Sequence, residues 1–156
     1  MCHPFVLFAL ITLNSGKGET VQVIPYLNFD GRCEEAIEFY RRALGAEVAM
    51  LSRYKDAPPE GCGPGAAPPG DKVMHASFRI GETAVMASDC HCGGKPNFQG
   101  FSLSITVPNE AAAERLFAAL SDGGQVQMPL TKTFFSPRFG LVADRFGVSW
   151  MIHVAP

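Results

Sequence analysis

The order of predicted elements repeats once along the chain, and this repeat limits the possible folds more than any other feature. Alternating apolar residues over 21–29 (VQVIPYLNF) predict a strand, a helix follows over 33–44, and Gly45 is its natural end. Three more strands are predicted before residue 90, and the same order begins again at 101–107. We therefore predict two βαβββ modules, with the remaining strands at 46–54, 72–80, 82–89, 125–133, 138–144 and 148–154 and the second helix at 109–124.

The repeat also holds at the level of single residues. When Ile24 is placed opposite Ser102, Leu27 falls opposite Ile105 on the apolar face of each first strand. The two helices match as well, provided that the first copy carries one extra residue at its turn. We expect a loose N-terminal extension at 1–20 and a single domain at 21–154, made of module one at about 21–89, a linker at 90–99 and module two at about 100–154.

Length and charge exclude several classes of partner. At 156 residues, with 47% apolar and 18% charged residues, the chain has the balance of one globular domain rather than of a disordered protein. The formal net charge is -2, and Arg41 and Arg42 form the longest basic run. Without a basic patch we expect no nucleic-acid partner, and we expect no binding to an anionic membrane.

The cysteines and the N-terminal segment bear on the cellular compartment. Five scattered cysteines are an odd number in a chain too large to need disulfides, which favours a reducing, cytoplasmic location. The apolar run PFVLFALITL (4–13) has the size of a signal-peptide core but is too short to span a bilayer. No Lys or Arg precedes it, and the NSGKG that follows offers no small-x-small cleavage site. We therefore expect an extension or an early start codon rather than a secretion signal.

The stretch CHCGG (90–94) raises the question of a metal site, because Cys and His are both good zinc ligands. It lies in the predicted linker, and two sulfurs one residue apart point in opposite directions in an extended chain. A closed tetrahedral site would need further ligands, for which Cys62 and His91 are the nearest candidates. We favour an exposed linker over a metal clasp.

Three segments together resemble the PhnB-like branch of the vicinal oxygen chelate superfamily, which includes glyoxalase I, bleomycin-resistance proteins and extradiol dioxygenases. These segments are IPYLNFDGRCEEAIEFYRRALGAEV, DKVMHASFRIGETAVMASD and ADRFGVSWMIHV, and the resemblance covers about residues 21–154. It implies an α+β fold in which two paired βαβββ modules form a curled mixed sheet, a cup with its helices outside. It also implies a homodimer, since many relatives pair in this way.

The resemblance implies a metal site, but this chain lacks suitable ligand side chains at the corresponding positions. Metal-dependent members hold a divalent ion with four side chains, from the first and last strand of each module. Carried over by position, those places fall at Ile24, near Met86, at Ser102 and at Met151. Hard divalent ions need carboxylate or imidazole donors, so we expect no cofactor there.

The strand faces supply the candidate ligand-binding residues. Alternation assigns Leu27, Phe78, Trp150 and Ile152 to the helix-packed faces. The opposite faces are predicted to be polar, a surface suited to a small-molecule site with a few convergent donors. The candidate ligand-binding residues are Tyr26, Asn28, His75, Arg79, Ser102, Ser104, Met151 and His153.

Each candidate has a structural alternative. His75 and His153 could act as acid or base or hold a shifted metal, or each could simply be hydrogen-bonded to a neighbouring strand. Arg79 could hold an anionic substrate or be a solvated arginine at the sheet edge. Asp144 is expected to fix the last hairpin, and Asp89 to cap a turn.

These observations leave the specific activity open and do not assign a catalytic residue. We favour a protein that binds a small organic molecule in the cup without the standard divalent metal. The alternatives are a metal-dependent glyoxalase or dioxygenase type of enzyme with shifted ligands such as His75 and His153, and an antibiotic-sequestering resistance protein. No glycine-rich phosphate loop, Rossmann fingerprint or Walker pattern follows a strand.

Overall fold

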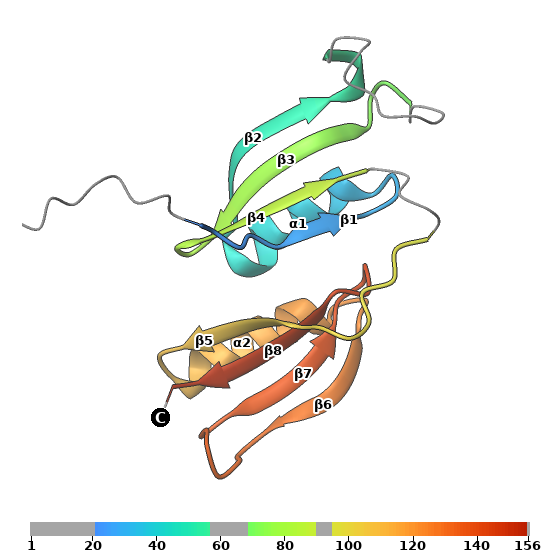
Figure 1. Ribbon diagram of the computed structural model, residues 1–156. Helices are drawn as coiled ribbons and strands as arrows, with labels where there is room; N and C mark the ends of the chain where they lie inside the picture. Colours follow the sequence, from blue (N-terminus) through green and yellow to red (C-terminus); the bar gives the residue numbers. More distant parts are fainter. Residues whose placement is uncertain (1–20, 57–68, 90–94, 156) are drawn as a thin grey trace, which may run out of the picture.

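The computed structural model describes residues 21–56, 69–89 and 95–155. The N-terminal extension, most of the Gly/Pro-rich loop and the Cys90-His91-Cys92 stretch lie outside this range. Figure 1 shows two modules in which strands and helices follow one another in the same order. Their elements are β1 (Tyr26–Asn28), α1 (Cys33–Leu44), β2 (Glu47–Arg53), the short 3-10 helix η1 (Tyr54–Asp56), β3 (Val73–Ile80), β4 (Thr83–Ser88), β5 (Leu103–Val107), α2 (Glu110–Ser121), β6 (Gln125–Thr131), β7 (Phe139–Ala143) and β8 (Ser149–Val154).

Each module folds into one four-stranded mixed sheet. The strand order is β1-β4-β3-β2 in the first sheet and β5-β8-β7-β6 in the second. The first strand of each module pairs in parallel with its last strand, and the other pairs are antiparallel. One helix lies behind each sheet, so both sheets turn their other face to the same side of the molecule (Figure 1). The α+β fold class predicted from the sequence is confirmed.

The first strand is shorter than the sequence predicts. Residues 21–29 were expected to form a strand with Val23 on the apolar face, but β1 spans only Tyr26–Asn28, and Val23 is 96% exposed. The extent of the neighbouring strand accounts for the first two of these residues. Tyr26 is opposite Met86 in the parallel pair, so Val23 would be level with Thr83, where β4 begins. Residues before Val23 therefore have no strand to pair with.

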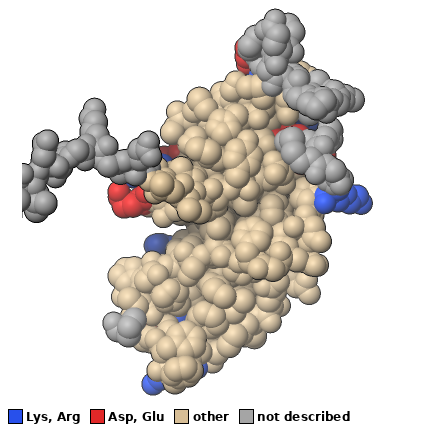
Figure 2. Space-filling view, viewed as in Figure 1, with Lys and Arg blue, Asp and Glu red and all other residues tan. Residues whose placement is uncertain are grey.

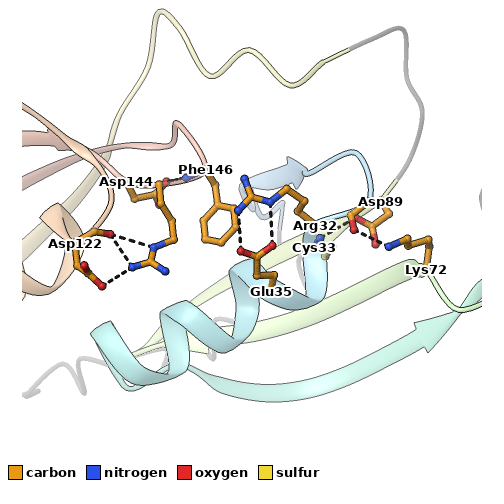
Figure 3. A network of polar contacts seen from close by, with 10 residues as sticks. Arg32, Cys33, Glu35, Lys72, Asp89, Asp122, Asp144 and Phe146 are labelled. Atoms are coloured by element: carbon orange, nitrogen blue, oxygen red, sulfur yellow. Dashed lines mark hydrogen bonds and ion pairs between the residues drawn. The ribbon is translucent and has the colours of Figure 1, made fainter.

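A buried aspartate fixes the start of α1. Arg32 occupies the N-cap position and makes no side-chain capping bond. The Asp89 carboxylate takes that role from the end of β4: one oxygen accepts from Cys33 N at 2.7 Å and the other from Val73 N at 3.0 Å. Asp89 thus joins the first turn of α1 to the first residue of β3, a longer-range role than the turn cap expected from the sequence. Figure 3 shows Asp89 beside Cys33.

Asp89→Ala is expected to lower the free energy of unfolding by about 2 kcal/mol, because two buried backbone N–H groups lose their acceptor. Asp89→Asn keeps one acceptor oxygen and should cost roughly half as much. Urea unfolding followed by circular dichroism measures both values. Equal stability of wild type and Asp89→Ala would contradict the capping role.

Aromatic side chains of both modules meet at one contact. Tyr40 of α1 packs against Trp150 of β8 with ring centroids 5.5 Å apart, and Phe29 packs against Phe146 at 5.8 Å. The Arg32 guanidinium lies over the Phe146 ring at 4.6 Å and pairs with Glu35 (Figure 3). Helix α1 buries Ala36, Ile37 and Tyr40 and partly buries Leu44, and Phe39 is buried as well. Phe39 packs against the second module, where its ring contacts that of Phe146.

No helix in the described part of the chain combines the length and apolar character needed to cross a membrane.

Candidate functional site

The face of each sheet opposite the helix is defined by strand register. In the first sheet Leu27, Phe78 and Ala87 are buried beneath α1, so side chains one position away point to the other side, called here the open face. One row of that face runs across all four strands through Tyr26, Met86, Ser77 and Met50.

The second sheet has an equivalent row. Gly140 marks its helix-packed side, because a Cβ there would meet the Phe117 ring of α2 at 2.8 Å. Its neighbour in sequence, Leu141, therefore points to the open face. The row runs through Ser104, Met151, Leu141 and Met128, and a second row contains Thr106, His153 and Phe139.

The candidates from the first module gather into small pairs on the open face. The Tyr26 hydroxyl lies 3.0 Å from His75 Nδ1, and the two rings are 5.6 Å apart. Ser88 Oγ donates to the Asn28 side chain at 2.9 Å. Arg79 stands apart at the hairpin end, exposed and paired with Glu82 at 3.1 Å.

The candidates from the second module are joined by hydroxyl contacts. Ser102 Oγ lies 2.8 Å from Ser149 Oγ, which donates to Gln127 at 3.1 Å. His153 Nε2 lies 2.9 Å from the Thr106 hydroxyl on the adjacent strand. His75 and His153 thus lie in different sheets, and each has the hydrogen bond to another strand that the sequence analysis gave as its structural alternative.

The open face is less polar than the sequence analysis predicts. Alternation alone placed Met151 on this face among hydroxyl, amide, guanidinium and imidazole groups. The three rows also bring Met50, Met86, Met128, Leu141 and Phe139 to this side. For Met50 and Met128 the cause is a register shift in each outer strand, between Val48 and Met50 and between Val126 and Met128. A bulge moves the following residue to the opposite face, and simple alternation does not show it.

Charged side chains are nearly absent from the open faces. Figure 2 shows this side of the molecule almost wholly uncharged, with Lys, Arg, Asp and Glu at its rim. Arg79 and Glu47, at one end of the first sheet, are paired with each other in register. The combined surface therefore offers hydroxyl, imidazole and thioether groups on an apolar background.

The four places carried over from metal-dependent relatives do not fit a hard divalent ion. Met86 lies beside Tyr26 and Met151 beside Ser104, so thioethers stand at the two last-strand positions, and Ile24 and Ser102 stand at the other two. Thioether sulfur, one hydroxyl and a hydrocarbon are poor ligands for such ions. Within residues 21–56, 69–89 and 95–155, no three His, Cys, Asp or Glu side chains form a group that could hold a metal ion.

A groove of about 540 Å³ separates the first sheet from β5. Its walls are the β3–β4 turn at Gly81 and Glu82, the length of β5, and Leu44 and Leu116 from the two helices. The volume lies in the usual range of small-molecule pockets. Through Ser104 and Thr106 the groove is continuous with the open face of the second sheet.

Comparison with known proteins places the chain in a family. Residues 21–153 match the family model described as 3-demethylubiquinone-9 3-methyltransferase. The chain is 36% identical over 136 residues to Protein YjdN of Escherichia coli, covering 83% of this chain and 92% of that protein.

Solved structures agree with this match. A PhnB protein from Bacillus cereus superposes with a TM-score of 0.72 at 31% identity, over 86% of this chain and all of the other. PA1353 from Pseudomonas aeruginosa gives 0.70 at 43% identity, over 87% and 98% of the two chains. A glyoxalase-related enzyme from Fulvimarina pelagi, at 20% identity, shares the fold with a TM-score of 0.57 over 86% and 88% of the two chains. The chain belongs to the family of the 3-demethylubiquinone-9 3-methyltransferase model and is a PhnB-like member of the vicinal oxygen chelate superfamily.

Proposed function

We propose that this protein binds a small organic molecule on the open faces of its two sheets. The observation that carries the proposal is the surface itself: eight strands present a nearly uncharged side on which hydroxyl and imidazole groups are set among apolar ones (Figure 2). An apolar surface with a few positioned polar groups is the usual form of a small-molecule site. Family membership supports the choice of this face over the helix side, since the carried-over positions of relatives fall on it.

Methionine methyl resonances offer a direct test of the ligand face. Met50, Met86, Met128 and Met151 lie on the open faces, whereas Met74 shares the other side of β3 with Ala76 and Phe78. With methyl-labelled protein and a library of small neutral and anionic compounds, binders should shift open-face methyl signals and leave Met74 in place. Binders that shift only Met74 or no methionine would contradict the proposed face.

We further propose that no divalent metal takes part at the carried-over positions. The support is the donor set of Ile24, Met86, Ser102 and Met151. The methyl transfer in the family's description is not proposed for this chain, since its sequence has no nucleotide-binding fingerprint after a strand.

Calorimetric titration with Ni²⁺, Zn²⁺, Mn²⁺ and Fe²⁺ tests the metal-free proposal. We expect no stoichiometric binding tighter than about 10 μM, because these ions bind through imidazole, carboxylate or thiolate donors and the four carried-over positions have none. A Cys90→Ser/Cys92→Ser variant removes the linker thiols as a source of incidental zinc binding. Tight binding that survives in this variant and is lost in His75→Ala or His153→Ala would contradict the metal-free proposal and support a metal site with shifted ligands.

We also propose a homodimer. Strand β1 lies at an edge of the first sheet and β5 at an edge of the second, and the two strands are not hydrogen-bonded to each other. Because Pro25 O and Phe29 N bond to β4, the intervening residues Tyr26 and Asn28 turn their backbone groups outward. Such unpaired edges favour strand pairing with a second chain. Light scattering coupled to size-exclusion chromatography should give twice the mass of 16.8 kDa; a monomer at 100 μM would contradict the pairing.

A further inference from the structure

Three phenylalanine rings form a series that leads from a turn onto the open face of the second sheet. Phe134 and Phe135 lie between β6 and β7, and Phe139 is the first residue of β7. The ring centroids of Phe134 and Phe135 are 5.0 Å apart, and those of Phe135 and Phe139 are 5.1 Å apart, both near edge-to-face. Phe134 is 101% exposed and Phe135 is 46% exposed.

The turn that carries these rings is firmly held at its base. Thr133 N donates to Ser136 O at 2.9 Å, and Ser136 N donates to the Thr133 hydroxyl at 3.1 Å. The buried Ser136 hydroxyl lies 2.8 Å from Val154 O and 2.7 Å from Arg138 O. These hydrogen bonds thus hold Phe134 in its exposed position. An exposed ring contributes no hydrophobic free energy to folding.

The series ends beside a mixed apolar and polar surface. Phe139 is opposite His153 in register, and Leu141 is opposite Met151 on the same face. Thioethers and aromatic rings attract one another, and methionine adapts its shape to a partner. His153 Nε2 contacts the Thr106 hydroxyl, which leaves Nδ1 as the second hydrogen-bonding atom of the imidazole.

The first sheet has more polar residues at the positions that correspond to Leu141 and Phe139. Met86 and Met151 hold the same place in their rows, and the residues next to them on the third strand are Ser77 and Leu141. Two positions earlier on those strands stand His75 and Phe139. The two halves of the open face therefore differ in chemistry although they share a topology.

We propose that the open face of the second sheet binds a neutral aromatic molecule, which packs against Phe139, Leu141 and Met151 and extends the ring series of Phe134 and Phe135. A hydroxyl or carbonyl group on the ligand would meet His153. This inference rests on the proposed function and names its ligand class and its half of the face. Neutrality follows from the lack of any Lys, Arg, Asp or Glu among the open-face residues of this sheet.

Fluorescence titration of the full chain with N-phenyl-1-naphthylamine, a neutral aromatic dye, tests the assignment. The related anion 8-anilinonaphthalene-1-sulfonate is the matched probe, and it should bind at least about tenfold more weakly because the open-face strand residues of the second sheet include no Lys or Arg to pair with its sulfonate. Equal or tighter binding of the anion would overturn the assignment of a neutral ligand.

Two matched substitutions locate the dye. Leu141→Gln should weaken dye binding about fivefold, since it replaces half-buried apolar contact area with an amide. Ser77→Gln, at the corresponding place in the first sheet, should change it less than about twofold. A larger effect of Ser77→Gln would overturn the inference while leaving the proposed function intact. Dye binding that neither variant affects would count against both.

Phe134→Ser offers a second test that does not depend on folding, because the side chain is fully exposed. We expect an unchanged Tm and dye binding about two- to twelvefold weaker, the range given by one lost aromatic contact. An unchanged dye affinity would overturn the role of the ring series. Light scattering on each variant identifies one other outcome: loss of dye binding together with dissociation into monomers would assign the face to a contact between copies and overturn the proposal.

Discussion

Asp144→Ala is expected to lower the free energy of unfolding by about 4 kcal/mol, because four donors lose one buried carboxylate. Oδ2 accepts from the Tyr40 hydroxyl at 2.8 Å and from Trp150 Nε1 at 2.9 Å. Oδ1 accepts from Phe146 N at 2.9 Å and from Val148 N at 3.1 Å. The carboxylate is only 3% exposed, so water cannot readily replace it.

Asp144 also joins the two modules, since Tyr40 belongs to α1 and the other three donors belong to the second module. Its loss should therefore weaken the contact between the modules as well as the last hairpin. Urea unfolding monitored by the single tryptophan measures the effect, because Trp150 is one of the donors.

Asp122→Ala is the matched control for this substitution. Asp122 pairs with Arg145 close to the same hairpin, but its side chain is 75% exposed. Exposed ion pairs contribute little, so its removal should cost less than about 1 kcal/mol. Similar losses for the two aspartates would mean that the buried network does not hold the modules together.

The sequence predicts the repeating parts of this fold better than the contacts between them. Both helices, the end of α1 at Gly45 and the β3–β4 hairpin at Gly81 follow from local patterns, and they are present. Asp144 was expected to fix only its own hairpin. Its bond to Tyr40 crosses 104 positions of sequence, and no local pattern indicates a partner at that distance.

The candidate site shows the same division. Alternation correctly placed Tyr26, His75, Ser104 and His153 away from the helices, because their strands are regular in register. It missed Met50 and Met128, because each follows a bulge in an outer strand. The exposed pair Phe134 and Phe135 carried no signal, since two adjacent phenylalanines in a sequence usually indicate core.

The missing metal donors and the apolar open face have a common physical consequence. A carboxylate or imidazole cluster would need either an ion or water to satisfy it, and would favour a charged or chelating ligand. Met86 and Met151 at those places instead add soft apolar surface next to Tyr26 and Ser104. This surface favours ligand binding through shape and ring contact rather than through coordination.

Two buried groups predict a loss of stability in alkaline solution. Burial raises the pKa of the Cys33 thiol, with the nearby Asp89 carboxylate adding to the effect. Burial likewise raises the pKa of Tyr40 well above its ordinary value, and its bond to Asp144 acts in the same direction. A raised pKa in the folded state means that stability is complete below the pKa of the unfolded chain and falls as pH rises above it.

The expected size of this loss follows from proton linkage. An unfolded cysteine titrates near pH 8.5, so each further pH unit should remove about 1.4 kcal/mol through Cys33, or about 2 kcal/mol by pH 10. Tyr40 adds its own contribution above about pH 10. Urea unfolding at pH 7, 8.5 and 10 under reducing conditions should show the decline in wild type and a shallower one in Cys33→Ala. The control is Cys90→Ser/Cys92→Ser, which removes two other thiols and keeps the fully buried Cys33. It should leave the pH dependence of the wild-type unfolding free energy unchanged. Parallel pH curves for wild type and Cys33→Ala would show that the Cys33 thiol does not set the alkaline limit.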